Sequence, residues 1–182
     1  MSEMFSRRVF LRGLGVVAAA AALTACSSTN EAVNQALIEG AVGGIVAKDC
    51  KIGRMTYWAA NATVPVYEIS FRIVMTNVSS KPVTLSGDNF ATTLDGTPIP
   101  PFNFSARDVG DADIWRTYDS LTIRPGEERS VALAYEISQP TYDSWYSSSR
   151  TVAVSFTCSN QRVTYTKNSR SDEITVSDIE TL

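Results

Sequence analysis

The side chains that could carry chemistry are few, because the 182-residue sequence contains three cysteines and no histidine. Histidine is the residue most often used as a general base or metal ligand near neutral pH. Its absence excludes Ser-His-Asp and Cys-His catalytic sites, and it excludes histidine-ligated zinc, haem or copper centres from this chain. Carboxylate pairs and lysines remain as catalytic options. The thiols of Cys26, Cys50 and Cys158 are therefore the first groups to interpret.

The chain begins with the features of an export signal. The segment 6–12 reads SRRVFLR and resembles the twin-arginine signal, Ser/Thr-Arg-Arg-x-Phe-Leu-Lys, with only the final Lys replaced by Arg. The residues that match at its specific positions are Arg7, Arg8, Phe10 and Leu11. The apolar stretch 13–22 that follows is too short to span a bilayer, which takes about 20 helical residues. The sequence therefore predicts a cleaved twin-arginine signal peptide over residues 1–25.

Cys26 is the predicted attachment point of a lipid. The segment 23–26, LTAC, resembles the lipobox of bacterial lipoproteins, in which the cysteine is linked to diacylglycerol and becomes the new amino terminus. The alternative is an unlipidated signal peptide with a chance cysteine at its edge. Two or three acyl chains, such as palmitate, anchor far better than one, since each buried methylene contributes about 0.8 kcal/mol. We therefore expect an extracytoplasmic protein held by its lipid at the cell membrane or an outer membrane.

Cys50 and Cys158 lie near the two ends of the mature chain. In an oxidising compartment such a pair reads most simply as a disulfide. That bridge would close a loop of about 100 residues, which chain-entropy estimates value at roughly 4 to 5 kcal/mol. The alternative is one reactive free thiol, which is less favoured because no histidine is available to lower its pKa. Because twin-arginine export implies, by analogy, folding in a reducing compartment, the fold should be reachable without the bridge.

The elements that position these residues are predicted to be strands. Beyond residue 51 the hydrophobic pattern has a period of two, as in the segment 67–75, YEISFRIVM, where the odd positions are apolar. Turn residues recur between such runs, for example Asp95-Gly96 and Pro125-Gly126. The predicted strands are 51–59, 66–76, 83–85, 90–94, 113–116, 121–123, 130–137, 150–158 and 162–167. They predict an all-β, immunoglobulin-like sandwich over residues 48–182, preceded by a tether over 26–47 that includes either a short helix or the start of a strand.

A family resemblance rests mainly on the turns and strand ends. The segments that carry it are 77–79 (NVS), 81–83 (KPV), 94–96 (LDG), 124–127 (RPGE) and 134–137 (AYEI). Over residues 52–166 they resemble the bacterial immunoglobulin-like lipoprotein domains of unknown function. The resemblance implies a lipid-anchored extracytoplasmic module with an interaction or accessory role. The chain departs from it in a long segment, 98–118, between two strands, so no ligand preference is carried over.

The segment 139–149 is the best candidate for a binding loop. It reads QPTYDSWYSSS and combines the aromatic residues Tyr142, Trp145 and Tyr146 with serines, a composition that resembles an antibody paratope. The alternative is that Tyr142 and Trp145 plug an open end of the sandwich and belong to the core. A contiguous exposed patch of the three aromatic side chains would support binding.

Charge and motifs narrow the partners further. The leader holds three arginines and one glutamate, so 13 basic and 18 acidic residues remain in the mature chain, a net charge of −5. No basic stripe is visible, so we expect no nucleic-acid partner. The carboxylates of Asp108, Asp111 and Asp113 lack the spacing of an EF-hand loop, which favours a solvated acidic loop over a cation site. We expect no cofactor and no metal.

The most consistent interpretation is a membrane-anchored extracytoplasmic lipoprotein that acts as a non-catalytic binding or accessory module of the cell envelope. Its expected partners are the membrane, through the amino-terminal lipid, and an envelope protein or a glycan. The alternative is a carboxylate-dependent envelope hydrolase that acts on a glycan. That enzyme would require two acidic side chains with raised pKa values in one pocket.

Overall fold

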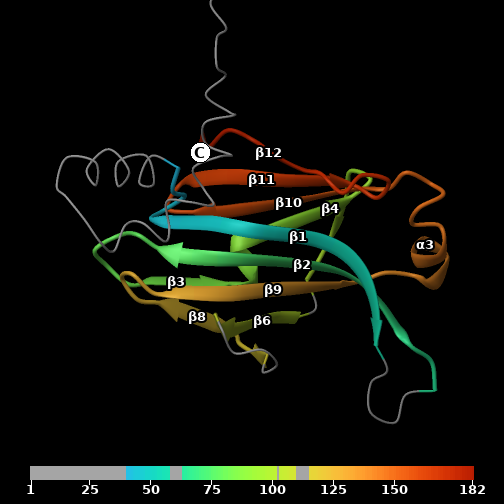
Figure 1. Ribbon diagram of the computed structural model, residues 1–182, viewed down its shortest axis with the longest axis horizontal. Helices are drawn as coiled ribbons and strands as arrows, with labels where there is room; N and C mark the ends of the chain where they lie inside the picture. The colour runs from blue at the N-terminus through green and yellow to red at the C-terminus, as the bar shows by residue number, and fades with distance from the viewer. Residues whose placement is uncertain (1–39, 58–62, 102, 110–114) are drawn as a thin grey trace, which may run out of the picture.

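The computed structural model describes residues 40–57, 63–101, 103–109 and 115–182 (Figure 1). The predicted export signal with Arg7, Arg8, Phe10 and Leu11, and the predicted lipidation site Cys26, lie outside the described residues. Among the described residues, no helix has the length and apolar character needed to cross a membrane.

Two antiparallel sheets face each other across a single core (Figure 1). The five-stranded sheet has the order β1 (Ile45–Tyr57), β2 (Val66–Asn77), β9 (Glu128–Glu136), β6 (Asn103–Asp108) and β7 (Arg116–Thr117). The six-stranded sheet has the order β12 (Ile174–Val176), β11 (Gln161–Asn168), β10 (Thr151–Cys158), β4 (Phe90–Leu94) and β5 (Thr97–Ile99), and β13 (Glu180–Thr181) also pairs with β11. A separate pair is formed by β3 (Val83–Ser86) and β8 (Ser120–Ile123).

The core forms because strands of both sheets alternate apolar and polar side chains. On β2 the odd residues from Ile69 to Met75 are buried, as the period-two pattern predicts. Aromatic rings join the sheets: the ring centroid of Phe71 on β2 lies 6.1 Å from that of Phe90 on β4 and 5.7 Å from that of Tyr165 on β11. The predicted all-β sandwich is confirmed.

The start of the domain differs from the predicted boundary at residue 48. Strand β1 begins at Ile45, so the strand option is correct for this part of the tether. Gly43 and Gly44 have φ values of +58° and +85°, a left-handed conformation that turns the chain into β1. The turn is tied down on both sides: the Gly43 amide donates to Gln161 Oε1 over 2.9 Å, and the Gly44 carbonyl accepts from the Val78 amide over 2.9 Å.

The segment 98–118 is also more regular than predicted. It contains β6, which pairs with β9 from Asn103 to Asp108 and therefore lies inside the five-stranded sheet. A short helix, α3 (Gln139–Asp143), follows β9 and lies at the end of the sandwich opposite the entry of the chain at residue 40 (Figure 1). A single 3-10 turn, η1 (Gly87–Asn89), connects β3 to β4.

The structure does not support the predicted disulfide between Cys50 and Cys158, because both cysteines are free thiols in it. Cys158 ends β10, and its Sγ lies 3.9 Å from the Gly43 carbonyl oxygen. Cys50 lies in a bulge of β1 on the Tyr165 side of the core, where a thiolate would raise the pKa of Tyr165. Tyr165 pairs with Val154, four residues along β10 from Cys158, which is about 13 Å at the rise of a strand. A disulfide requires Cα atoms within about 7 Å.

Candidate functional site

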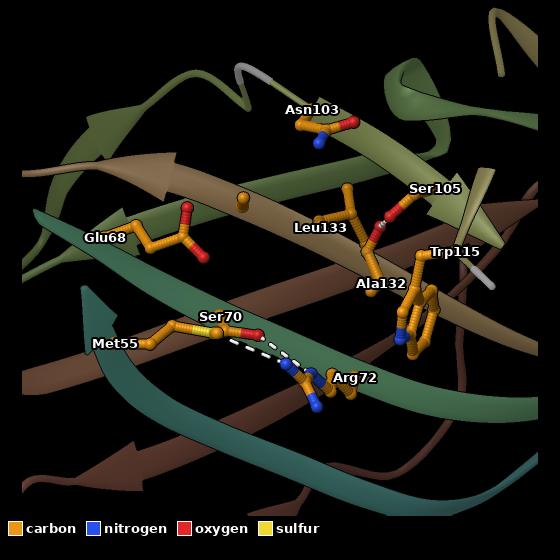
Figure 2. Close-up of a pocket in the computed structure, with 10 residues that line it drawn as sticks. Met55, Glu68, Ser70, Arg72, Asn103, Ser105, Trp115, Ala132 and Leu133 are labelled. Carbon is orange, nitrogen blue, oxygen red and sulfur yellow. Dashed lines mark hydrogen bonds between the residues drawn. The ribbon is translucent and has the colours of Figure 1, made fainter. Parts of the chain in front are cut away.

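A hollow opens on the outward face of the five-stranded sheet because small side chains line up there across the strands. The register aligns Gly53 of β1, Ser70 of β2, Ala134 of β9 and Asn103 of β6 in one row. The next row contains Ala132 and Ser105 between longer neighbours. The hollow has a volume of about 210 Å³ (Figure 2). A Cβ atom added to Gly53 would meet no other atom within 4 Å, so the β1 side of the row is also open.

Trp115 stands at one side of this hollow, immediately before β7 (Figure 2). Two guanidinium groups lie against its indole. The Cζ atom of Arg107 is 4.9 Å from the ring centroid, and that of Arg72 is 5.6 Å away. At these distances the positive charges are attracted to the electron-rich ring. The tryptophan is therefore held at the sheet surface by charged neighbours on β2 and β6.

Arg72 leans along β2 over the floor of the hollow. Its Nε donates to Ser70 Oγ over 3.3 Å, and its Nη2 lies 3.4 Å from the Met55 sulfur (Figure 2). Met55 pairs with Glu68 in the register of β1 and β2. The guanidinium group therefore points back toward Glu68, although the two side chains form no ion pair among the described residues.

Glu68 is the acidic group of the hollow. The residue is only 6% exposed, yet within the described chain its carboxyl has no hydrogen bond or ion pair. Burial raises the pKa of the Glu68 carboxyl above its usual value, and the positive charge of Arg72 partly opposes this rise. Its register partner on β9, Glu136, is exposed. The hollow thus combines a buried acid, a guanidinium group, an aromatic ring and a floor of small side chains.

The predicted binding loop has a different structure from an exposed aromatic patch. Trp145 is 3% exposed and belongs to the core, so its assignment to a binding surface is wrong and the plug alternative is correct for this residue. Tyr142 is half-buried, with its ring centroid 5.1 Å from that of Tyr67. Only Tyr146 is well exposed, at 59%. Serine and aromatic composition alone did not distinguish a plug from a paratope.

Two arginines hold this loop in place. The guanidinium carbon of Arg54 lies 4.2 Å from the ring centroid of Tyr142 and 4.7 Å from that of Tyr146, and its Nη1 donates to the Tyr142 carbonyl. Arg170 Nε donates to the Tyr146 carbonyl over 2.9 Å, and its Nη2 donates to the Ser147 carbonyl. These donors are used to fix the loop backbone, which indicates a structural role.

The residues that form the hollow were not among the sequence-predicted site residues. Period-two alternation placed Glu68, Ser70 and Arg72 on the solvated face of a strand without indicating what faced them. The small residues at outward positions of several strands could have indicated the hollow. They do so only once the register that aligns these strands is known. Among the described residues, no group of three Cys, Asp or Glu side chains is placed to hold a metal ion. Asp111 and Asp113 lie outside the described residues.

Comparisons with known proteins give distant structural likenesses only. No family model matches the chain, and no curated protein matches it. A solved structure of an uncharacterized beta-sandwich protein from Clostridium difficile 630 is 14% identical, covers 67% of this chain and 83% of its own, and gives a TM-score of 0.42. A protein from Archaeoglobus fulgidus is 12% identical over 71% of this chain and 90% of its own, with a TM-score of 0.33. A functionally unknown protein from Listeria monocytogenes EGD-e is 12% identical, covers 64% of this chain and 78% of its own, and gives a TM-score of 0.34.

Proposed function

We propose that this protein is a lipid-anchored extracytoplasmic module that binds a component of the cell envelope in the hollow of the five-stranded sheet, without catalysis. The observation that carries the proposal is the state of Glu68, which is buried at the hollow and has no partner within the described chain. A buried polar or charged group without a partner destabilises a fold. The Glu68 oxygens are not among the fully enclosed unpaired atoms of the described chain, so the hollow gives them access to a hydrogen-bond donor, and a ligand that supplies this donor would stabilise the site.

The anchoring half of the proposal is supported by the sequence of the leader. The segment SRRVFLR at 6–12 and the segment LTAC at 23–26 are consistent with export followed by lipidation of Cys26. In the fold, the chain enters the domain at the Gly43 end, and α3 lies at the far end (Figure 1). The hollow lies on a sheet face between these ends, where a tether at one end would leave it open to the aqueous space.

A second candidate function is the carboxylate-dependent hydrolase. The observation in its favour is that Glu68 and Glu136 are direct partners in the register of β2 and β9, which places their Cβ atoms about 5 Å apart. Glycoside hydrolases use two carboxyl groups that flank the scissile bond. However, Glu136 does not line the hollow, so the described site presents one of the two required groups. Binding therefore accounts for the geometry with fewer assumptions.

Photo-crosslinking in intact cells tests the proposed site. A benzophenone amino acid at position 55, at the wall of the hollow, is compared with one at position 122, an exposed position on β8. We expect a crosslinked envelope component from position 55 that disappears when Ala134→Leu fills the hollow in the same chain. Equal crosslinking from positions 55 and 122, or crosslinking from position 55 that Ala134→Leu leaves unchanged, would overturn the proposal.

A further inference from the structure

The size of the hollow limits what enters it. Pockets that enclose a drug-sized ligand measure about 300–1,000 Å³. The hollow measures about 210 Å³ and lies open on a sheet face, so it accommodates one ring-sized unit of a ligand that continues across the surface. Its floor consists of residues such as Ser70, Ala132 and Ala134, whose short side chains leave a flat surface between the longer walls.

The charges of the hollow limit the ligand further. Glu68 and Arg72 both line it, and they are not joined by an ion pair. An anionic ligand would be placed against Glu68, and a cationic ligand would be placed against Arg72. A hydroxyl group can pair with both side chains, since it donates one hydrogen bond to the Glu68 carboxyl and accepts others from the Arg72 guanidinium. Asn103 adds a donor, because its Oδ1 already accepts from Thr117 Oγ1 over 3.3 Å and its amide nitrogen forms no hydrogen bond within the described chain.

A peptide strand would fit this place poorly. Peptides that bind sheets gain most of their affinity by adding a strand to an open edge, where main-chain groups are unpaired. The hollow instead lies over β2 and β9, which are both paired on two sides, so their main-chain groups are already bonded in the ladders. Side chains alone must therefore recognise the ligand.

Trp115 supplies the remaining contact. Arg72 and Arg107 lie over the Trp115 ring, and the half-buried indole adds an apolar contact for the C–H groups of a saturated ring where these guanidinium groups leave it accessible. We infer that the hollow binds one ring of an uncharged, hydroxyl-rich oligosaccharide, which packs against the accessible part of the Trp115 indole while its hydroxyl groups bridge Glu68 and Arg72. This inference rests on the proposed function and names the ligand class of the same site.

Titration calorimetry with defined oligosaccharides tests the inference. The full chain is purified in a detergent without a sugar head group, because a maltoside would compete for the hollow. The probes are neutral oligomers of glucose and of N-acetylglucosamine. Their charged counterparts, each called a charged match, are an anionic uronic acid oligomer and a cationic glucosamine oligomer. We expect at least one neutral series to bind, and we expect each charged match to bind at least tenfold more weakly.

Variants connect the binding to the hollow. Trp115→Ala and Ala134→Leu should each weaken binding of the neutral oligomer at least tenfold, and Trp115→Phe should restore part of it. Tyr146→Ala removes an exposed aromatic side chain from the loop that follows α3, so it serves as the matched control and should bind like the wild type. Unchanged thermal midpoints and circular dichroism spectra identify the variants that are still folded.

Three results would overturn the inference: no neutral oligosaccharide binds, a charged match binds more tightly, or folded Ala134→Leu binds as well as the wild type. The photo-crosslinking experiment keeps this failure separate from that of the proposed function. If crosslinking from position 55 still depends on an open hollow, the site remains and only the carbohydrate assignment is lost. If crosslinking from position 55 fails as well, both the proposed binding site and the carbohydrate assignment are wrong.

Discussion

Glu68 and Glu136 are direct partners in the register of β2 and β9, yet Glu68 is buried and Glu136 is exposed. Glu68 lies among the side chains that line the hollow, whereas Glu136 is outside that set. Two like residues at one level of a sheet thus have different environments. The buried member carries the cost of desolvation, and this cost depends on pH.

Glu68→Gln should remove a pH-dependent destabilisation. The folded-state pKa of Glu68 is raised, so the carboxyl is neutral in both states below the usual glutamate pKa and imposes no cost there. As the pH rises through the raised pKa, the folded state must bury a charge and stability falls. We therefore expect wild type and Glu68→Gln to be similarly stable at pH 4, and Glu68→Gln to be more stable at pH 8. Urea denaturation at both pH values measures this, and a variant that is less stable at pH 8 would contradict it.

Asn77→Ala should cause one of the larger losses of stability among single substitutions. Asn77 is completely buried, and its Nδ2 donates to the carbonyls of Lys81 and Ile123, each over 2.8 Å. Its Oδ1 accepts from the Ser79 amide over 2.9 Å. Alanine leaves several buried groups unpaired, at about 1–3 kcal/mol each when no water replaces the partner. We expect a loss of about 3 kcal/mol in the free energy of unfolding by urea denaturation.

The neighbouring exposed residue Ser80 is the control for Asn77. Ser80→Ala changes the same turn without removing a buried hydrogen bond, so its effect should stay within about 0.5 kcal/mol. If the two variants lose equal stability, the loss comes from a change in the turn and not from the removal of the buried amide of Asn77.

The sequence predicted those features of the fold that depend on residues close together in the chain, and it did not predict the hollow. The alternation around Phe71 and the turn at Asp95-Gly96 predicted strands and a sandwich, because both signals lie within a few residues. The hollow requires Gly53, Ser70, Ala134 and Asn103 to be aligned, and register between distant strands leaves no local trace. The structure does not support the predicted disulfide for the same reason, since the pairing of Cys50 and Cys158 depends on their positions along two different strands.

The free thiols are directly countable. Mature protein denatured without reductant should contain two titratable thiols, those of Cys50 and Cys158, while an acylated Cys26 contributes none. A count of zero would mean that a disulfide forms. In the folded protein, burial raises the pKa of the Cys50 thiol to about 12, so very little of it is thiolate at pH 8. Alkylation of native Cys50 should therefore be much slower than alkylation of the denatured chain.

Membrane attachment should depend on Cys26 and not on the folded domain. Cys26→Ser removes the thiol that accepts the lipid, so the protein should move from the membrane pellet to the soluble fraction and keep the thermal midpoint of the wild type. Ser27→Ala, one residue further along, is the matched control and should stay in the pellet. A Cys26→Ser variant that still sediments with membranes would show that something other than this lipid holds the protein.

A ligand of the hollow should lie beside Trp115 and not at the α3 loop. The sequence has three tryptophans, so protein labelled with ¹⁵N-tryptophan reports at three indole N–H signals, and Trp115→Phe and Trp145→Phe assign two of them. Addition of a solubilised envelope fraction should shift or broaden the Trp115 signal and leave that of buried Trp145 unchanged. A shift at Trp145 with none at Trp115 would contradict the account.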